Sequence, residues 1–173
     1  KPIRHDPTWQ REKHHTPLAD YLVDRAVTAL NGVGPVKVTG SIRNRDRASG
    51  AELAGEIARR AAKVYEGGVA PQSMEVHLTG TAGQSFGAFC VDKLALYLTG
   101  EANDYVGKSM SGGLIAIRPA PGYAMADAPL GSRPVLVGNT VLYGASGGEL
   151  FVAGAAGERV AVRNSGATAV VEG

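Results

Sequence analysis

Val36-Lys37-Val38-Thr39-Gly40 returns as Val76-His77-Leu78-Thr79-Gly80 and again as Leu96-Tyr97-Leu98-Thr99-Gly100. The first two copies lie 40 residues apart and the last two lie 20 apart. Each copy is a short strand of alternating apolar residues that ends in glycine. Repeats of this length are typical of solenoids, in which each coil buries its apolar row against its neighbours. The pattern predicts a mainly β solenoid of parallel strands with coils of about 20 residues.

Two helices are expected beside these strands. The first should begin at Thr16, with Pro17 at its first position, and end at Asn31-Gly32. The second should begin at a capping box, Ser49-Gly50-Ala51-Glu52, and run through Tyr65. We interpret it as an excursion inserted into a coil, which explains the doubled 40-residue spacing. The expected organisation is an N-terminal arm and helix over residues 1–35 and a β domain over 36–173, with the inserted helix at about 50–65.

The second half of the chain predicts more short strands, spaced by about ten residues, which is half a coil. Each ends in glycine or asparagine, residues that tolerate the left-handed backbone of a sharp corner. The last strand has no polar cap, and the chain opens on Lys1 rather than methionine, so we expect it to be part of something longer. The expected strands are Val135–Gly138, Val141–Gly144, Leu150–Gly154, Val160–Asn164 and Ala169–Gly173.

Composition argues against several classes of function. The longest uncharged runs are broken by glycine, so no membrane span is predicted. A single cysteine fits a reducing compartment, and the cytoplasm is the expected location. Residues 1–63 hold 12 Lys and Arg against 7 Asp and Glu, whereas residues 64–173 hold 6 against 9. The early cations are interleaved with acids, as in Arg11-Glu12-Lys13, which argues against a nucleic-acid strip.

Several longer stretches carry a family resemblance. They are Gly50–Arg60, Leu78–Phe89, Gly100–Gly113, Gly157–Arg159 and Val162–Gly173, and Ala102-Asn103-Asp104-Tyr105-Val106-Gly107-Lys108 is the most specific of them. Together they resemble the C-terminal GXGXG domain of the glutamate synthase large subunit. The resemblance implies a right-handed parallel β-helix that acts as a spacer.

The resemblance also implies partners and cofactors outside this sequence. The parent enzyme would make glutamate from glutamine and 2-oxoglutarate, with an amidotransferase domain and a synthase domain that holds FMN and a 3Fe–4S cluster. Electrons would come from NADPH, through an FAD-containing small subunit, or from ferredoxin. We expect this segment to pack against those domains, possess no catalytic, cofactor or metal residues and have no enzymatic activity of its own. It should not bind nucleic acid or membranes.

Two other functions are considered. The first is a free-standing β-helix scaffold or binding module of another complex, similar to the glycine-patterned component of formylmethanofuran dehydrogenase. The second is a small hydrolase with Cys90 or Ser165 as nucleophile, for which the sequence offers no adjacent base.

Four candidate sites are interpreted as non-functional. Gly80–Gly87 looks like a phosphate loop but is followed by strand-like Ala88–Val91 rather than a helix, which favours corner glycines. Adjacent His14 and His15, with His5, Asp6 and Glu12, lack the fixed geometry of a metal site. Apolar neighbours should raise the thiol pKa of Cys90, and His77 is expected to be a sheet-surface residue.

Polar residues at the expected corners suggest internal bonding between coils. Asn103-Asp104 and Asn164-Ser165 should bond to backbone groups of the next turn. Asp104 is expected to pair with Lys108. Arg159 and Arg163, near Glu158 and Glu172, are expected to meet a partner domain.

Overall fold

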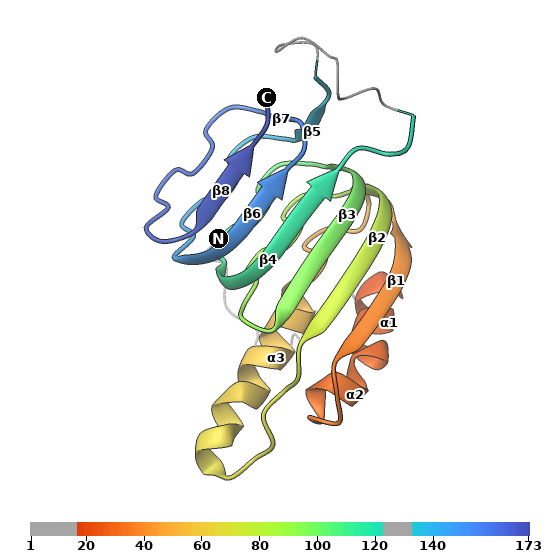
Figure 1. Cartoon of the computed structure of the whole chain (residues 1–173), viewed down its shortest axis with the longest axis vertical. Coiled ribbons are helices and arrows are strands. Elements are labelled where there is room, and N and C mark those ends of the chain that lie inside the picture. The colour runs from red at the N-terminus through yellow and green to blue at the C-terminus, as the bar shows by residue number, and fades with distance from the viewer. Residues whose placement is uncertain (1–16, 123–132) are drawn as a thin grey trace, which may run out of the picture.

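A computed structural model describes residues 17–122 and 133–173 (Figure 1). These residues form a parallel sheet in the order β1-β2-β3-β4-β6-β8, with β5 and β7 beside it. The strands are β1 Val36–Ile42, β2 Met74–Ala82, β3 Leu94–Ala102, β4 Ser111–Arg118, β5 Val135–Val137, β6 Gly147–Val152, β7 Ala155–Ala156 and β8 Thr168–Val171. The helices are α1 Pro17–Arg25, α2 Val27–Leu30, α3 Ala51–Lys63 and the 3-10 helix η1 Val64–Glu66. The expected β-rich, parallel character is confirmed.

The 20-residue period sets the pairing of β2 with β3. His77 faces Tyr97, and Gly80 faces Gly100. The 40-residue spacing is wrong as a pairing rule for β1, because Gly40 faces Leu78 rather than Gly80. A shift of two residues keeps every side chain on the same face of a sheet, so Val38 still lies inside opposite Val76. The shifted register therefore keeps the same side chains buried, although the glycines of the motif are no longer paired.

Apolar side chains form two rows on the inner face of the sheet, and the shorter row is Leu78, Leu98, Ile117 and Val152. One row runs through Val38, Val76, Leu96, Ile115 and Leu150, all at most 4% exposed. Leu22, Ala26 and Leu30 from the N-terminal helices and Leu53 and Ile57 from α3 are buried in the same cluster. The helices thus share the core of the sheet.

The helices lie where they were expected, with changes at their ends. The first is divided into α1 and α2 at Ala26. The second runs from Ala51 and ends in η1, followed by Gly67 in the left-handed region. The capping box is wrong at its first residue, because the N-cap is Gly50 and the Ser49 hydroxyl donates to the Asp46 carbonyl at 3.2 Å. The expected cap at Thr16 lies outside the described residues.

Arg60 attaches α3 to the end of α2. Its guanidinium donates to Asn31 Oδ1 at 2.7 Å and to Glu56 Oε1 at 2.7 Å. Hydrogen bonds from Arg59 and Arg60 hold the pKa of the Glu56 carboxyl below its usual value. The helix that interrupts the coils is therefore fixed to the N-terminal helices.

Two of the expected strands are wrong: Val141–Gly144 and Val160–Asn164 form turns. Alternate residues there adopt left-handed backbone, as at Leu142 (φ 56°) and Ala161 (φ 60°). The amide of Leu142 donates to the Val106 carbonyl and that of Ala161 to the Val141 carbonyl, both at 2.8 Å. Val141 and Leu142 are fully buried, so their apolar character reflects core packing and not extended backbone. The strand expected at Ala88–Val91 is also a turn.

These turns stack on one another across the chain. The amide of Phe89 donates to the Lys108 carbonyl at 2.8 Å, and the amide of Ser109 donates to the Tyr143 carbonyl at 2.9 Å. The amide of Gly144 continues the series to the Val162 carbonyl at 3.0 Å. Each turn is thus joined to its neighbours through its backbone, as the strands are.

Candidate functional site

The outer face of the sheet presents one continuous row of mainly apolar side chains. Strand register brings the row together from six strands, because alternate residues of paired strands point to the same side. We call this row the outer row. Its members are Thr39, His77, Tyr97, Ala116, Phe151 and Val170.

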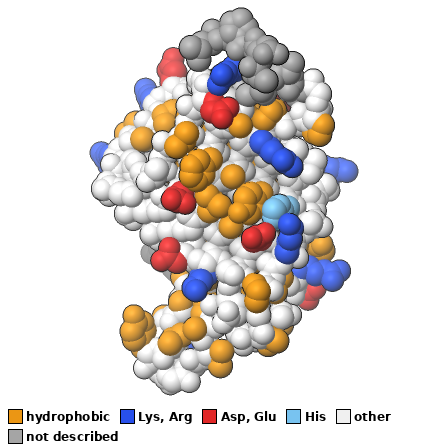
Figure 2. Space-filling model, in the orientation of Figure 1, with side chains coloured by type: hydrophobic (Ala, Val, Ile, Leu, Met, Phe, Trp, Pro, Cys, Tyr) orange, Lys and Arg blue, Asp and Glu red, His pale blue; other side chains and the backbone are white. Residues whose placement is uncertain are grey.

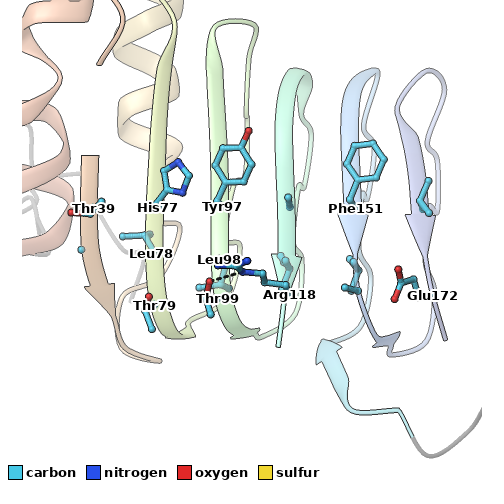
Figure 3. A pocket seen from close by; sticks show the side chains of 16 residues that line it. Thr39, His77, Leu78, Thr79, Tyr97, Leu98, Thr99, Arg118, Phe151 and Glu172 are labelled. Atoms are coloured by element: carbon cyan, nitrogen blue, oxygen red, sulfur yellow. Dashed lines mark hydrogen bonds between the residues drawn. The ribbon is translucent and has the colours of Figure 1, made fainter. Parts of the chain in front are cut away.

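The outer row crosses a hollow with a volume of about 520 Å³ (Figure 3). Phe151 is 39% exposed and Val170 is 47% exposed, although both are apolar. Figure 3 shows the rings of His77, Tyr97 and Phe151 on neighbouring parts of the sheet, with Arg118 near the ends of the strands. The arrangement can bind a flat apolar surface, and it offers few groups for chemistry.

The His77 ring stacks on the Tyr97 ring with centroids 4.4 Å apart and an angle of 13° between planes. His77 Nε2 lies 3.1 Å from Glu75 Oε2 on the same strand. His77 is thus a sheet-surface histidine paired with a carboxylate, as its strand position predicted. Two residues further along β3 and β4, on the same face of the sheet, Arg118 Nε donates to Thr99 Oγ1 at 3.1 Å.

The Gly80–Gly87 loop connects β2 to a stacked turn. Gly80 has a φ of 132°, and a Cβ there would overlap the Ile42 carbonyl oxygen. The amides of Ser85 and Gly87 donate to the carbonyls of Asp104 and Ser49 at 2.8 and 3.0 Å. The loop therefore uses these N–H groups to hold adjacent coils together. Close approach between neighbouring strands explains the glycine at position 80.

Cys90 is fully buried, and its Sγ lies 3.7 Å from the Leu94 carbonyl oxygen. Burial raises the pKa of the thiol from 9.0 to about 12. The expected upward shift is confirmed. The neutral thiol is a poor nucleophile, which disfavours Cys90 as the nucleophile of a hydrolase.

Polar side chains bridge successive turns at one corner, as expected. Asp104 Oδ1 accepts the amide of Asn139 at 2.7 Å, and Asn139 Oδ1 accepts the amide of Glu158 at 2.8 Å. The expected backbone partner is wrong for Asn103, whose side-chain amide donates to the Asn44 side-chain oxygen Oδ1 at 3.2 Å. We call Asn44, Asn103, Asp104 and Asn139 the corner ladder.

The Asn164-Ser165 pair only partly follows this pattern. Asn164 Oδ1 accepts the amides of Gly166 and Ala167 within its own turn. The Ser165 hydroxyl lies 3.4 Å from the Ala145 carbonyl of the adjacent turn, as expected. Asn164 closes its own turn because its short side chain reaches the amides two and three residues further along the chain.

The expected pair between Asp104 and Lys108 is wrong. The Asp104 carboxylate accepts a hydrogen bond from the Asn139 amide. The Lys108 ammonium lies instead 5.4 Å from the centroid of the Tyr105 ring. Arg163 lies over the Tyr143 ring at 5.9 Å. Glu172 is 3.8 Å from Arg133, a partner that the sequence did not indicate.

Residues 17–122 and 133–173 contain no group of three or more potential metal ligands. No helix in the same ranges is long and apolar enough to cross a bilayer. His5, Asp6, Glu12, His14 and His15 lie outside the described residues.

Sequence reasoning missed the outer row. The 20-residue repeat contained part of the signal, because aligning its two later copies places His77 beside Tyr97. Phe151 could not be aligned in this way, since β4 was not expected and its pairing with β6 follows no 20-residue offset.

A family model and three similar proteins agree on the kind of protein that contains this sequence. A model of the GXGXG motif family matches residues 19–173. The chain is 45% identical over 164 residues to the NADH glutamate synthase of Saccharomyces cerevisiae, covering 94% of this chain and 7% of that protein. It is 50% identical over 132 residues to the large chain of the NADPH glutamate synthase of Azospirillum brasilense, covering 76% and 8%. It is 48% identical over 170 residues to the ferredoxin-dependent glutamate synthase of Cyanidium caldarium, covering 96% and 10%.

Proposed function

Because the chain belongs to the GXGXG motif family and its relatives are glutamate synthases, we propose that it is a structural domain of a glutamate synthase large subunit. The chain spans a tenth or less of the length of these relatives. In this role it holds the amidotransferase and synthase domains at a fixed separation and performs no chemistry itself. The whole protein would make glutamate from glutamine and 2-oxoglutarate in the cytoplasm.

The stack of turns is the observation that carries this proposal. Amides of successive turns donate to carbonyls of adjacent turns, and the corner ladder adds side-chain bonds in the same direction. A stack held at every level by hydrogen bonds resists bending and stretching, which suits a spacer. We infer that it is a right-handed β-helix, since parallel strands are nearly always connected with that hand.

The relatives support a role that is independent of the electron donor. Their names specify NADH, NADPH and ferredoxin, yet this segment is 45 to 50% identical to all three. A surface that recognised the donor would be expected to differ between them. We therefore assign donor binding, including any contact with a small subunit that carries FAD, to other parts of the assembly.

The segment does not fit the iron–sulfur cluster of such an enzyme. A 3Fe–4S cluster is held by several cysteine thiolates, and this chain has one cysteine, buried with a raised pKa. We therefore assign the cluster to the synthase domain, where the family resemblance also places FMN.

A coil-duplication experiment tests the spacer role in the full-length protein. Repeating residues 83–102 adds one 20-residue period and lengthens the stack by about 4.8 Å, the spacing between paired strands. We expect glutamine hydrolysis and ammonia-dependent glutamate synthesis to persist while glutamine-dependent synthesis falls. A matched control inserts 20 Gly and Ser residues after Gly67, outside the stack. Unchanged glutamine-dependent synthesis in the duplicated variant would contradict the proposal.

The size of the native polypeptide separates this proposal from a free-standing scaffold. Immunodetection in a cell lysate should give a band far above 17.8 kDa. A band near 17.8 kDa would instead favour an independent scaffold or binding module of another complex. Glutamine-dependent turnover by the isolated segment would overturn the non-catalytic assignment.

A further inference from the structure

We propose that Asn31, in the turn after α2, is a deamidation site and that Arg60 controls how fast it reacts. The change converts the side-chain amide of Asn31 to a carboxylate and requires neither an enzyme nor a cofactor. The inference goes beyond the proposed function and does not depend on it, because it concerns a covalent change within this segment.

The residue after Asn31 makes it the most reactive asparagine of the chain. Deamidation begins when the backbone nitrogen of the next residue attacks the asparagine side chain, and glycine obstructs this attack least because it has no side chain. Asn31 precedes Gly32, and no other asparagine of the sequence precedes a glycine. The other asparagines are Asn44, Asn103, Asn139 and Asn164. In an unfolded chain, Asn31 should therefore react first.

The reaction consumes water and releases ammonia. The Gly32 nitrogen loses its proton and forms a bond to Asn31 Cγ, while the bond from Cγ to Nδ2 breaks and Nδ2 leaves as ammonia. Water then opens the resulting cyclic imide at either carbonyl carbon, which gives aspartate or isoaspartate. Asn31 is exposed, so water reaches the site.

The fold requires the glycine that makes Asn31 reactive. Gly32 has a φ of 71°, and a Cβ there would overlap the Val69 side chain. Its amide donates to the Ala29 carbonyl at 3.0 Å, and the amide of the next residue donates to the Thr28 carbonyl at 3.0 Å. These two bonds form the Schellman motif, which ends a helix with a left-handed glycine. The turn therefore retains glycine at position 32, and with it the reactive pair.

The folded turn restrains both reacting groups. The Gly32 N–H is donated to the Ala29 carbonyl, so its nitrogen is not free to attack. The Arg60 guanidinium donates to Asn31 Oδ1 at 2.7 Å and is itself held by Glu56 Oε1 at 2.7 Å. Attack requires the Asn31 side chain to leave Arg60 and the Gly32 amide to leave its acceptor. The site should thus react only after a local opening of this turn.

Either product changes the connection between α2 and α3. Aspartate places a carboxylate beside Arg60 and makes the pair charge-assisted. Isoaspartate adds a carbon to the backbone, which displaces the Gly32 amide from the Ala29 carbonyl. Both helices lie at the lower end of the molecule in Figure 1, and Figure 2 shows hydrophobic side chains gathered over the middle of the sheet, away from them. The change is therefore separate from the outer row.

Peptide mass spectrometry of the full-length protein, incubated in a mildly alkaline buffer, tests the site. In guanidinium chloride, Asn31 should convert before the other asparagines. In the folded protein, its conversion should be slower by about tenfold or more, since the reaction then depends on local opening. Folded and unfolded rates within twofold of each other would overturn the inference, as would earlier conversion of another asparagine in the unfolded protein.

Substitution of Arg60 tests the control of the rate. Arg60→Ala should speed conversion of Asn31 in the folded protein by about tenfold, because a hydrogen bond from a charged donor shifts an equilibrium by roughly that factor. The matched control is Arg59→Ala, which removes a guanidinium that bonds to Glu56 on the same helix and should leave the rate within twofold of the wild type. Conversion of Asn164 reports general unfolding and should stay unchanged in both variants. An unchanged rate at Asn31 in Arg60→Ala, or an equal rise at Asn164, would overturn the control by Arg60.

Discussion

The rings of His77 and Tyr97 lie stacked at 4.4 Å because β2 and β3 pair with an offset of one 20-residue period. The same offset places Thr79 beside Thr99 and Gly80 beside Gly100. Repetition in the sequence thus becomes direct contact between equivalent side chains.

The stacked rings should contribute to stability. A double-mutant cycle with His77→Ala and Tyr97→Ala is expected to give a coupling energy of about 0.5 to 1 kcal/mol. The measurement is the free energy of unfolding by urea for the four proteins. As a control, Tyr97→Ala combined with Tyr65→Ala should be additive, since Tyr65 is 95% exposed on η1. A coupling energy of zero for the first pair would show that the stack adds nothing to folding.

Two glycine substitutions should have opposite effects. Gly100 has a φ of 145°, and a Cβ there would overlap the Gly80 carbonyl oxygen. Gly100→Ala should therefore lower the free energy of unfolding by about 3 kcal/mol or more. Gly55 lies within α3 with no atom within 4 Å of an added Cβ, so Gly55→Ala should raise it by about 0.5 to 1 kcal/mol. Thermal unfolding monitored by circular dichroism measures both, and a tolerated Gly100→Ala would be incompatible with the observed approach of β2 and β3.

Cys90 should make stability dependent on alkaline pH. Its pKa is 9.0 when exposed and about 12 when buried, so the folded state holds the thiol proton more tightly than the unfolded state. The stabilisation is complete below pH 9 and is lost as pH rises toward 12, at up to about 1.4 kcal/mol per pH unit. Urea unfolding of wild type and Cys90→Ala across this range isolates the contribution. Parallel stability profiles for the two proteins would rule out the raised pKa.

The corner ladder should be sensitive to Asn139. Asn139→Ala removes the acceptor for the Glu158 amide and should cost about 1 kcal/mol. Hydrogen exchange at the Glu158 amide should speed up in the same variant. Glu158→Ala is the matched control, since it keeps that amide and removes only an exposed side chain, with an expected change of about 0.5 kcal/mol or less. Similar losses in both variants would mean that the ladder does not join the turns.

The sequence predicted the elements whose local pattern and burial agree. The repeats that contain Leu78 and Leu98 gave parallel strands in the correct register, and the inserted helix lies close to its expected range of 50–65. The strand prediction failed at Val141 and Leu142. Apolar residues that fill the core from a turn containing left-handed backbone look like a strand in the sequence. It also missed β4, whose pairing shifts between Ser111 and Leu114 and so breaks the 20-residue rhythm. The outer row required long-range pairing of β4 with β6, which a local pattern does not encode.

The helix between β1 and β2 has a consequence for how such a chain can vary in length. β1 and β2 pair over seven residues although α3 and η1 lie between them in the sequence. The entropic cost of closing a loop rises slowly as the connecting segment lengthens, so this connection can accept whole new elements while the rod beneath it stays unchanged. The exposed turn at Gly67, after η1, is therefore a natural grafting point for a fluorescent reporter or an affinity tag.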